Sequence, residues 1–289
     1  MAVGEVRRAP RQPTGEVPAD SLRRMQDRLA RRRLFGLDFV DAPDIASAAE
    51  LVLGYDRSPA DDGLLPVLVT PNVDQLVKVD AGSDPVAAEL VRTARYVFAD
   101  GQPIVWASRL LGAPLTTRLA GSVLIGELWP RLIADGVPVL VIASSDEIAD
   151  LVRQSHPGAV AVVAPQLRVD DPGAVDDFAA RCIAAIDPAT TAHVFVTLGY
   201  PRRERLIRVM IDRWPAGVPY PLFAAVGASF EMLFGLKKQA PRWVQRAGLE
   251  WFFRFVQEPR RLFRRYFIDD MAFFPLVWRE WRRTRRSAR

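Results

Sequence analysis

The sequence predicts an α/β domain with a single open, mostly parallel sheet and a helical C-terminal appendage. The first observation is a series of short, continuously apolar segments, which are typical of strands buried on both faces of a sheet. The second is that these segments alternate with helical patterns of about 10–15 residues, the arrangement of βαβ units. The third is size and composition: 289 residues, 49% hydrophobic and 25% charged, are ordinary for a globular protein with a sizeable core.

The apolar segments and the helical patterns follow one another in a regular order. Expected strands lie at 34–40, 65–70, 96–99, 137–143, 159–165, 193–199 and 221–227. Expected helices lie at 45–55, 73–79, 84–94, 145–154, 172–186, 201–214 and 228–235. Asp84-Pro85 opens one of these helices with a cap and a first-turn proline, and Pro201 is similarly suited to a first helical turn.

Charge divides the chain into three parts. Residues 1–33 hold nine arginines and four acidic residues and read as a disordered or loosely helical leader. Residues 34–239 hold seventeen bases and twenty-five acids and form the expected catalytic domain. Residues 240–289, with thirteen arginines and five acids, form an appendage in which arginines alternate with aromatic residues. Basic ends of this kind indicate nucleic acid, an anionic membrane or a phosphate-rich ligand.

Several classes of protein and site are disfavoured by composition. The single cysteine, Cys182, excludes an internal disulfide, and two histidines leave no thiolate or His-rich metal site, so we expect a cytoplasmic protein. The N-terminal arginines are not followed by the apolar segment of a signal peptide. No segment approaches the roughly 18 apolar residues of a membrane span. Glycine-rich phosphate loops, the GxSxG elbow, HEXXH and an Asp-x-Asp pair after a strand are not found, so we expect acid/base and electrostatic chemistry without a metal.

Candidate site residues follow the strands, because ligands of open α/β sheets bind beyond the carboxyl ends of the strands. The candidates are Thr70-Pro71-Asn72, Asp100-Gly101, Gly199 through Glu204, and Gly227-Ala228-Ser229. The turn that ends in Arg202, Arg203 and Glu204 suits a phosphate. Each candidate also has a structural interpretation: Thr70 and Asn72 as helix caps, Asp100 as a turn former, and the glycine turn as an ordinary strand–helix junction.

Taken together and in order, these segments resemble one family. TPNVDQL (70–76), ADGQPIVWASRLLG (99–112), TRLAGSVL (117–124), VTLGYPRRERLI (196–207), AAVGASFEMLFGLKKQAPRWVQRAGLEW (224–251) and FRFVQEPRRLFRR (253–265) are similar to motifs of the WecG/TagA/CpsF glycosyltransferases, glycosyltransferase family 26. The resemblance extends from about Leu34 to about Tyr266. It implies a Rossmann-like fold of the GT-E type. It also implies an inverting transfer, without a cofactor or required metal, from a UDP-sugar donor to a polyprenyl-diphosphate-linked acceptor, by an enzyme peripherally associated with the inner face of the membrane.

The resemblance also assigns roles to particular residues. Asp100 matches the general base, and Thr70 matches a residue that contacts a substrate near the reacting centre. Asn72, Gly101, Arg118, Gly121, Gly199, Arg203, Glu204 and Gly227 fall in the matching motifs and are expected to bind substrate. Arg254, Arg261 and Arg264 match the appendage arginines that face the diphosphate.

Departures from the family pattern affect the choice of sugar. The usual P-K-Q-E is Pro201-Arg202-Arg203-Glu204, the usual R-A-P is Gln239-Ala240-Pro241, and the usual E-R-x-x-G-x-D-L loses both acids in residues 117–124. The donor sugar therefore stays open among N-acetylmannosamine-type sugars, uronic acids and glucose. An inactive scaffold in polysaccharide assembly and, more remotely, a nucleic-acid-binding protein are the alternatives. The acidic central part argues against nucleic acid. A homo-oligomer is compatible with the sequence, which does not set the oligomeric state.

Overall fold

The structure, a computed structural model, describes residues 30–58, 62–168, 170–238, 241, 244, 250–257 and 259–287. Its centre is a six-stranded sheet with the order β4-β3-β8-β7-β5-β6, in which every pair of neighbours is parallel. The strands are β3 (Leu65–Val69), β4 (Ala94–Val97), β5 (Val139–Ala143), β6 (Ala159–Val163), β7 (His193–Val196) and β8 (Leu222–Ala225). The predicted open parallel α/β fold is confirmed.

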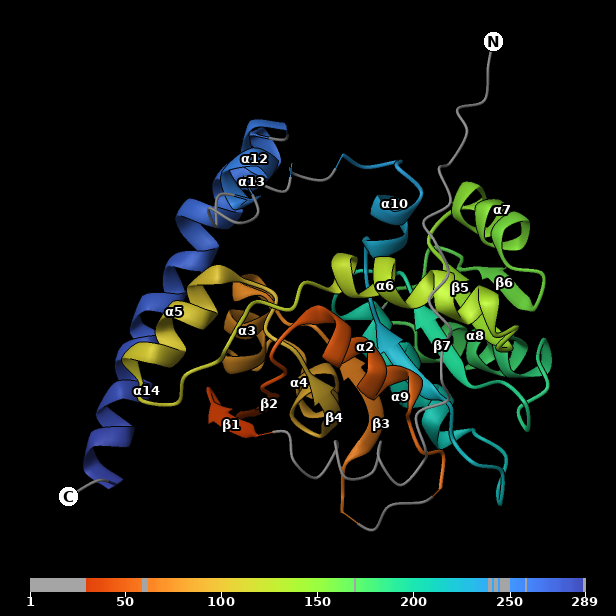
Figure 1. Cartoon of the computed structure of the whole chain (residues 1–289), viewed down its shortest axis with the longest axis horizontal. Helices are drawn as coiled ribbons and strands as arrows, with labels where there is room; N and C mark the ends of the chain where they lie inside the picture. Colours follow the sequence, from red (N-terminus) through yellow and green to blue (C-terminus); the bar gives the residue numbers. More distant parts are fainter. Residues whose placement is uncertain are drawn as a thin grey trace.

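Helices cover both faces of this sheet (Figure 1). One face packs against α3 (Val73–Asp80), α4 (Pro85–Arg92), α5 (Gln102–Leu110), α8 (Pro172–Ala184) and α9 (Arg202–Asp212). The other packs against α2 (Ile45–Leu53), α6 (Gly121–Ala134), α7 (Asp146–Ser155) and α10 (Ser229–Leu233). Strand side chains alternate between the two cores, as period-2 geometry requires: Val194 and Val196 enter the first core and Phe195 enters the second.

The N-terminal part of the domain corrects one prediction. Residues 34–40 do not form a single strand, because Phe35 and Gly36 both have positive φ angles, 54° and 74°, and turn the chain. The result is a separate antiparallel hairpin of β1 (Arg31–Leu34) and β2 (Leu37–Val40). Ordered structure therefore includes Arg31 to Arg33, which we had placed in the leader; the rest of that leader lies outside the described residues.

The C-terminal appendage, here the helices between residues 250 and 287, lies along one side of the body, here residues 30–238 (Figure 1). It comprises α12 (Glu250–Gln257), α13 (Pro259–Arg264), the π-helix η1 (Arg265–Asp269), the 3-10 helix η2 (Asp270–Ala272) and α14 (Phe273–Ser287). The Phe35 and Phe273 rings are 5.7 Å apart, and the Phe35 N–H donates to Glu280 Oε1 at 3.3 Å. Arg279 also pairs with Asp80 of α3. The last helix is thus attached to both the hairpin and the sheet domain.

Candidate active site

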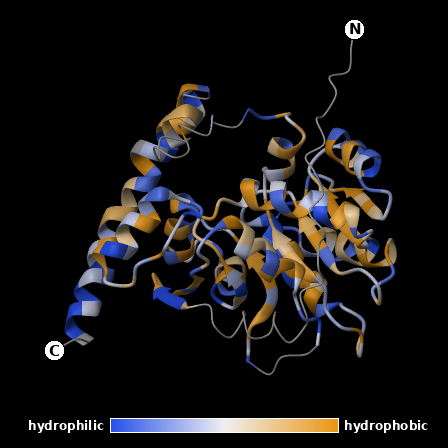
Figure 2. Cartoon of the chain, viewed as in Figure 1, coloured by the Kyte–Doolittle hydropathy of each residue, from blue (hydrophilic) through white to orange (hydrophobic). Residues whose placement is uncertain are grey.

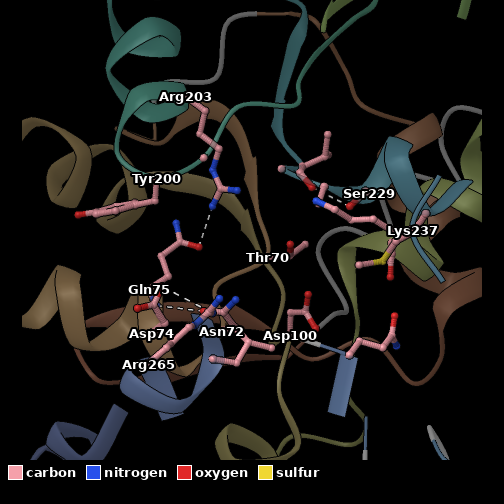
Figure 3. A pocket seen from close by; sticks show the side chains of 18 of the residues that line it. Thr70, Asn72, Asp74, Gln75, Asp100, Tyr200, Arg203, Ser229, Lys237 and Arg265 are labelled. Carbon is pink, nitrogen blue, oxygen red and sulfur yellow. Dashed lines mark hydrogen bonds and ion pairs between the residues drawn. The ribbon is translucent and has the colours of Figure 1, made fainter. Parts of the chain in front are cut away.

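A cavity of about 680 Å³ lies beyond the carboxyl ends of β3, β4, β7 and β8. Strand ends and the turns after them supply most of its lining, while the C-terminal appendage supplies one wall with Gln257, Leu262, Arg265 and Tyr266. Figure 3 shows Arg203 at one edge, Asp100 at the opposite edge and Thr70 between them, with Ser229 and Lys237 to one side. This is the position that the sheet topology predicts for a ligand site.

Asp100 connects the ends of two strands to the start of α6. Its backbone N–H donates to the Pro71 carbonyl at 3.0 Å, and its Oδ2 accepts from the Gly121 N–H at 3.3 Å. Gly121 is the first residue of α6, and Ala120, the residue at the N-cap, makes no side-chain cap hydrogen bond. A carboxylate at the positive end of a helix is electrostatically favoured. Asp100 is therefore held at the cavity by the first turn of α6.

Position 121 has to be glycine because neighbouring side chains leave no room for a side chain there. A methyl group on its Cα would lie 2.6 Å from Thr70 Oγ1 and 3.4 Å from Ser229 Oγ. The Ser229 hydroxyl donates to the Val226 carbonyl at 2.7 Å, which orients it at the end of β8. The glycine thus lets the Thr70 and Ser229 hydroxyls lie close to the start of α6, where Asp100 accepts from the Gly121 N–H.

Asn72 caps a helix and also lies at the cavity. Its Oδ1 accepts from the Gln75 N–H at 3.1 Å and caps α3, and its side chain also lines the cavity. Thr70 does not cap that helix; it is 9% exposed and faces the cavity. Tyr200, also in the lining, is partly buried, and burial raises the pKa of its phenol so that it stays protonated at neutral pH.

The junction after β7 brings charge to the cavity through Arg203. Gly199 and Arg203 line it, whereas Glu204 is fully buried behind them and accepts from Arg203 Nε at 2.7 Å. Gly227 has φ +53°, and a methyl group there would lie 2.8 Å from Arg203 Nη1. This glycine is therefore needed both for its left-handed backbone and for the guanidinium that lies over it. Glu204 is fully buried and is not in the cavity lining, so it reaches the cavity only through Arg203.

Further cations lie at the side of the cavity toward the appendage. Lys237 and Lys238 are in its lining, and Lys237 pairs with Glu231. Arg265 approaches Asp74 at 3.5 Å, with its guanidinium 5.9 Å from the centre of the Tyr266 ring. The cavity lining therefore holds two carboxylates, Asp74 beside Lys78 and Arg265 and Asp100 at the start of α6, together with positively charged groups from two parts of the chain.

Some predicted residues lie elsewhere. Gly101 follows Asp100 as the N-cap of α5 and Arg118 is half-buried before α6, and neither is in the cavity lining. The Arg264 side chain is 80% exposed and 3.9 Å from Asp269, so it does not face the cavity. Successive helical residues differ by about 100° in direction, and it is Arg265 that points inward. The side chains of Arg254 and Arg261 lie outside the described residues.

Comparison with known proteins identifies the family. The Glycosyl transferase WecG/TagA/CpsF family matches residues 32–287, nearly nine-tenths of the chain. The chain belongs to this family. A relative from Bacillus spizizenii, an N-acetylglucosaminyldiphosphoundecaprenol N-acetyl-β-D-mannosaminyltransferase, is 29% identical over 232 residues, which cover 78% of this chain and 82% of the relative. The cavity described above is thus the candidate active site of a WecG/TagA/CpsF glycosyltransferase.

Metal-ligand clusters and membrane-spanning helices are two further features of interest in the described residues. Within the described ranges, His, Cys, Asp and Glu side chains do not gather in groups of three or more that could hold a metal ion. Among the same residues, none of the helices combines the length and apolar character needed to span a membrane.

Proposed function

We propose that the protein is an inverting glycosyltransferase that moves a sugar from a UDP-sugar to a polyprenyl-diphosphate-linked sugar, without a metal, in the synthesis of a cell-surface polymer or exopolysaccharide. The observation that carries the proposal is the position of Asp100, a carboxylate in a cavity that is also lined by Arg203, Lys237, Lys238 and Arg265. The substrates are each anionic through a diphosphate, and the reaction between them needs a base. The cavity contains side chains suited to both requirements.

In this mechanism Asp100 removes the proton from a hydroxyl of the acceptor sugar. The hydroxyl oxygen attacks C1 of the donor sugar from the face opposite the UDP, which inverts the configuration. The C1–O bond to the β-phosphate breaks, and its electron pair leaves on the UDP oxygen. Arg203 and the lysines at the cavity stabilise the negative charge that develops there. Thr70 and Ser229 are placed to orient sugar hydroxyls near Asp100.

The acceptor is expected to reach the cavity from the cytoplasmic face of the membrane. The appendage exposes large apolar side chains between arginines, and orange and blue segments alternate along its helices in Figure 2. The exposed side chains are Phe252, Val256, Phe263, Ile268, Met271, Phe274 and Trp278. Such a surface suits the boundary between lipid headgroups and acyl chains, where each arginine near anionic lipid contributes about 1 kcal/mol. Peripheral membrane association is therefore part of the proposal.

The relative named above supports an N-acetylglucosaminyl-diphospho-polyprenol acceptor and an N-acetylmannosamine donor as the first pair to test. The departures in residues 117–124 keep glucose and uronic acid donors in the test set, because this segment leads into Gly121 at the cavity. The identity of the donor sugar therefore has to be determined within the proposed reaction.

The test is a transfer assay on purified protein. It combines a panel of UDP-sugars with short-chain polyprenyl-diphosphate-linked N-acetylglucosamine and glucose, for the wild type and Asp100→Asn. Transfer from one donor that is lost in the variant, with UDP binding retained, supports the proposal and its base. Transfer that survives in the variant removes Asp100 from the mechanism. UDP binding without turnover on any pair would favour the inactive scaffold.

A further inference from the structure

A buried triad of side chains lies behind one edge of the cavity. Arg203 Nε donates to Glu204 Oε1 at 2.7 Å, and Arg203 Nη2 donates to Gln75 Oε1 at 2.9 Å. Gln75 Nε2 closes the ring by donating to the same Glu204 Oε1 at 2.9 Å. Gln75 is 3% exposed and Glu204 is fully buried, so the guanidinium is held from the protein side by groups that water does not reach.

This arrangement leaves one edge of the guanidinium toward the cavity. The Arg203 side chain is only 12% exposed, and among the described residues its Nη1 has no hydrogen-bond partner. Nη1 lies over Gly227, whose missing side chain leaves the space that it occupies. Because Nε and Nη2 are both held, the plane of the guanidinium is fixed and the direction of the Nη1 hydrogens is fixed with it.

Stability alone does not account for the triad. Glu204 Oε2 is buried without a hydrogen-bond partner in the described part of the chain, so the ion pair is incompletely satisfied. A buried ion pair of this kind is weak evidence for stability, because apolar residues of similar volume often stabilise as well or better. A guanidinium fixed before the ligand arrives, in contrast, loses little conformational freedom on binding and presents its charge in one direction.

We infer that Gln75 and Glu204 are positioning residues that fix Arg203 so that its Nη1 edge binds a diphosphate. The inference rests on the proposed function, because both substrates of that reaction carry a diphosphate: the UDP of the donor and the prenyl diphosphate of the acceptor. Glu204, which is fully buried, and Gln75, which lines the cavity but is only 3% exposed, then act through Arg203. The cavity thereby gains an anion site held entirely by the body of the protein.

The experiment is a double-mutant cycle read by calorimetric titration with UDP and, separately, with geranyl diphosphate. The variants are Gln75→Ala, Arg203→Lys and the two combined. Lysine keeps the charge beside Glu204 but not the planar fork, and we expect the dissociation constant of the diphosphate to rise about ten- to hundredfold. Gln75→Ala is expected to raise it about tenfold alone and to have almost no effect in the Arg203→Lys background, because the two residues act as a unit.

Two controls separate positioning from folding. Arg208→Lys changes an arginine of the same helix that pairs with Asp212 on the outer surface, and it should leave both affinities unchanged. Thermal unfolding without ligand, together with the longer replacement Gln75→Met, tests whether Gln75→Ala acts by loosening α3. Glu204→Gln, which keeps the acceptor oxygen for Arg203 Nε, should lose less affinity than Glu204→Ala.

The two ligands also identify the source of the diphosphate. Weaker binding of UDP alone assigns Arg203 to the donor, and weaker binding of geranyl diphosphate alone assigns it to the acceptor; either result supports the inference. Unchanged affinity for both ligands in Arg203→Lys, or equal effects of Gln75→Ala in both backgrounds, overturns it while transfer by the wild type still supports the proposed function. A wild-type protein that binds neither ligand and transfers no sugar overturns both.

Discussion

The two walls of the cavity are built differently. On the body side, Asp100 is held by backbone groups of β3 and α6, Asn72 by its cap, and Arg203 by two buried side chains. On the appendage side, Arg265 is held by Asp74 at 3.5 Å, and its buried Nε has no hydrogen-bond partner among the described residues. The body wall is therefore held by several short hydrogen bonds, whereas Arg265 of the appendage wall is held by a longer ion pair with Asp74.

The appendage is attached most firmly away from the cavity. Phe273, Leu276 and Glu280 of α14 are buried against the hairpin and the sheet domain. Near the cavity, Leu262 is buried, but neighbouring Phe263 is exposed. From this difference we expect that α14 anchors the appendage, while α12 and α13 adjust to a long lipid-linked substrate. The predictions below test the division between a fixed wall and an adjustable one.

The largest effect is expected on the body side from Asp100→Asn. Asparagine keeps an oxygen for the Gly121 N–H but cannot accept the acceptor's proton, so transfer should fall about 10²–10⁴-fold. The rate of sugar transfer measures this, and the melting temperature and UDP affinity serve as controls for the fold. A loss of UDP binding equal to the loss of rate would instead make Asp100 a binding residue.

Gly121→Ala should also damage the body wall. The new methyl would lie 2.6 Å from Thr70 Oγ1, and relieving the overlap should cost about 1–3 kcal/mol of unfolding free energy. Gly126→Ala, in the same helix with no atom within 4 Å of the added methyl, is the matched control and should stabilise by up to about 1 kcal/mol. Urea unfolding measures the unfolding free energy of both variants. Equal changes in the two variants would mean that Thr70 moves aside freely.

On the appendage side, Arg265→Ala and Arg264→Ala form a matched pair of adjacent arginines. Arg265 lines the cavity and Arg264 is exposed, so kcat/KM for the lipid-linked acceptor should fall about tenfold for the first variant and little for the second. Soluble short-chain acceptors keep membrane binding out of the comparison. The reverse ranking would show that the appendage turns about its axis when substrate binds.

The smallest effect concerns Asp270, beside Arg265. Burial raises the pKa of this carboxyl to about 6. The positive charges of Arg265 and Lys78 lower the pKa, and the negative charges of Asp74 and Asp269 raise it. Because the folded protein holds this proton more tightly than the unfolded chain does, the group adds stability as pH falls from about 6 toward 4. Asp270→Asn should therefore raise the melting temperature at pH 7 and flatten its dependence between pH 4 and 6. A variant that melts lower at pH 7 would contradict this.

Sequence patterns predicted the body wall better than the appendage wall. Continuous apolar runs such as Val139–Ala143 identify central strands, and the carboxyl ends of parallel strands must converge, which brought Thr70, Asp100, Gly199 and Gly227 together in the prediction. Residues whose role depends on the rotation of a helix were harder to assign. Gln75 resembles any polar residue on a helix, and only the packing of α13 and η1 decides between Arg264 and Arg265.

The prediction of a single strand at residues 34–40 failed for a related reason. Leu34, Phe35 and Leu37 form an apolar run, which favours one strand, and the only signal for a turn is Gly36. The chain turns there, where Phe35 and Gly36 have positive φ angles, and the Phe35 ring and N–H have partners on α14. A contact between residues 245 positions apart cannot be read from a local pattern.

That contact also sets an order of events during synthesis. The partner of the Phe35 N–H, Glu280, and the cavity residue Arg265 are both near the C-terminal end of the chain. Translation therefore produces the strands of the sheet and Asp100 before it produces the appendage wall of the cavity. A nascent chain thus holds Asp100 in place without a closed site around it. Under the proposed function, sugar transfer needs this completed wall, so activity is expected to begin only after the appendage helices have left the ribosome.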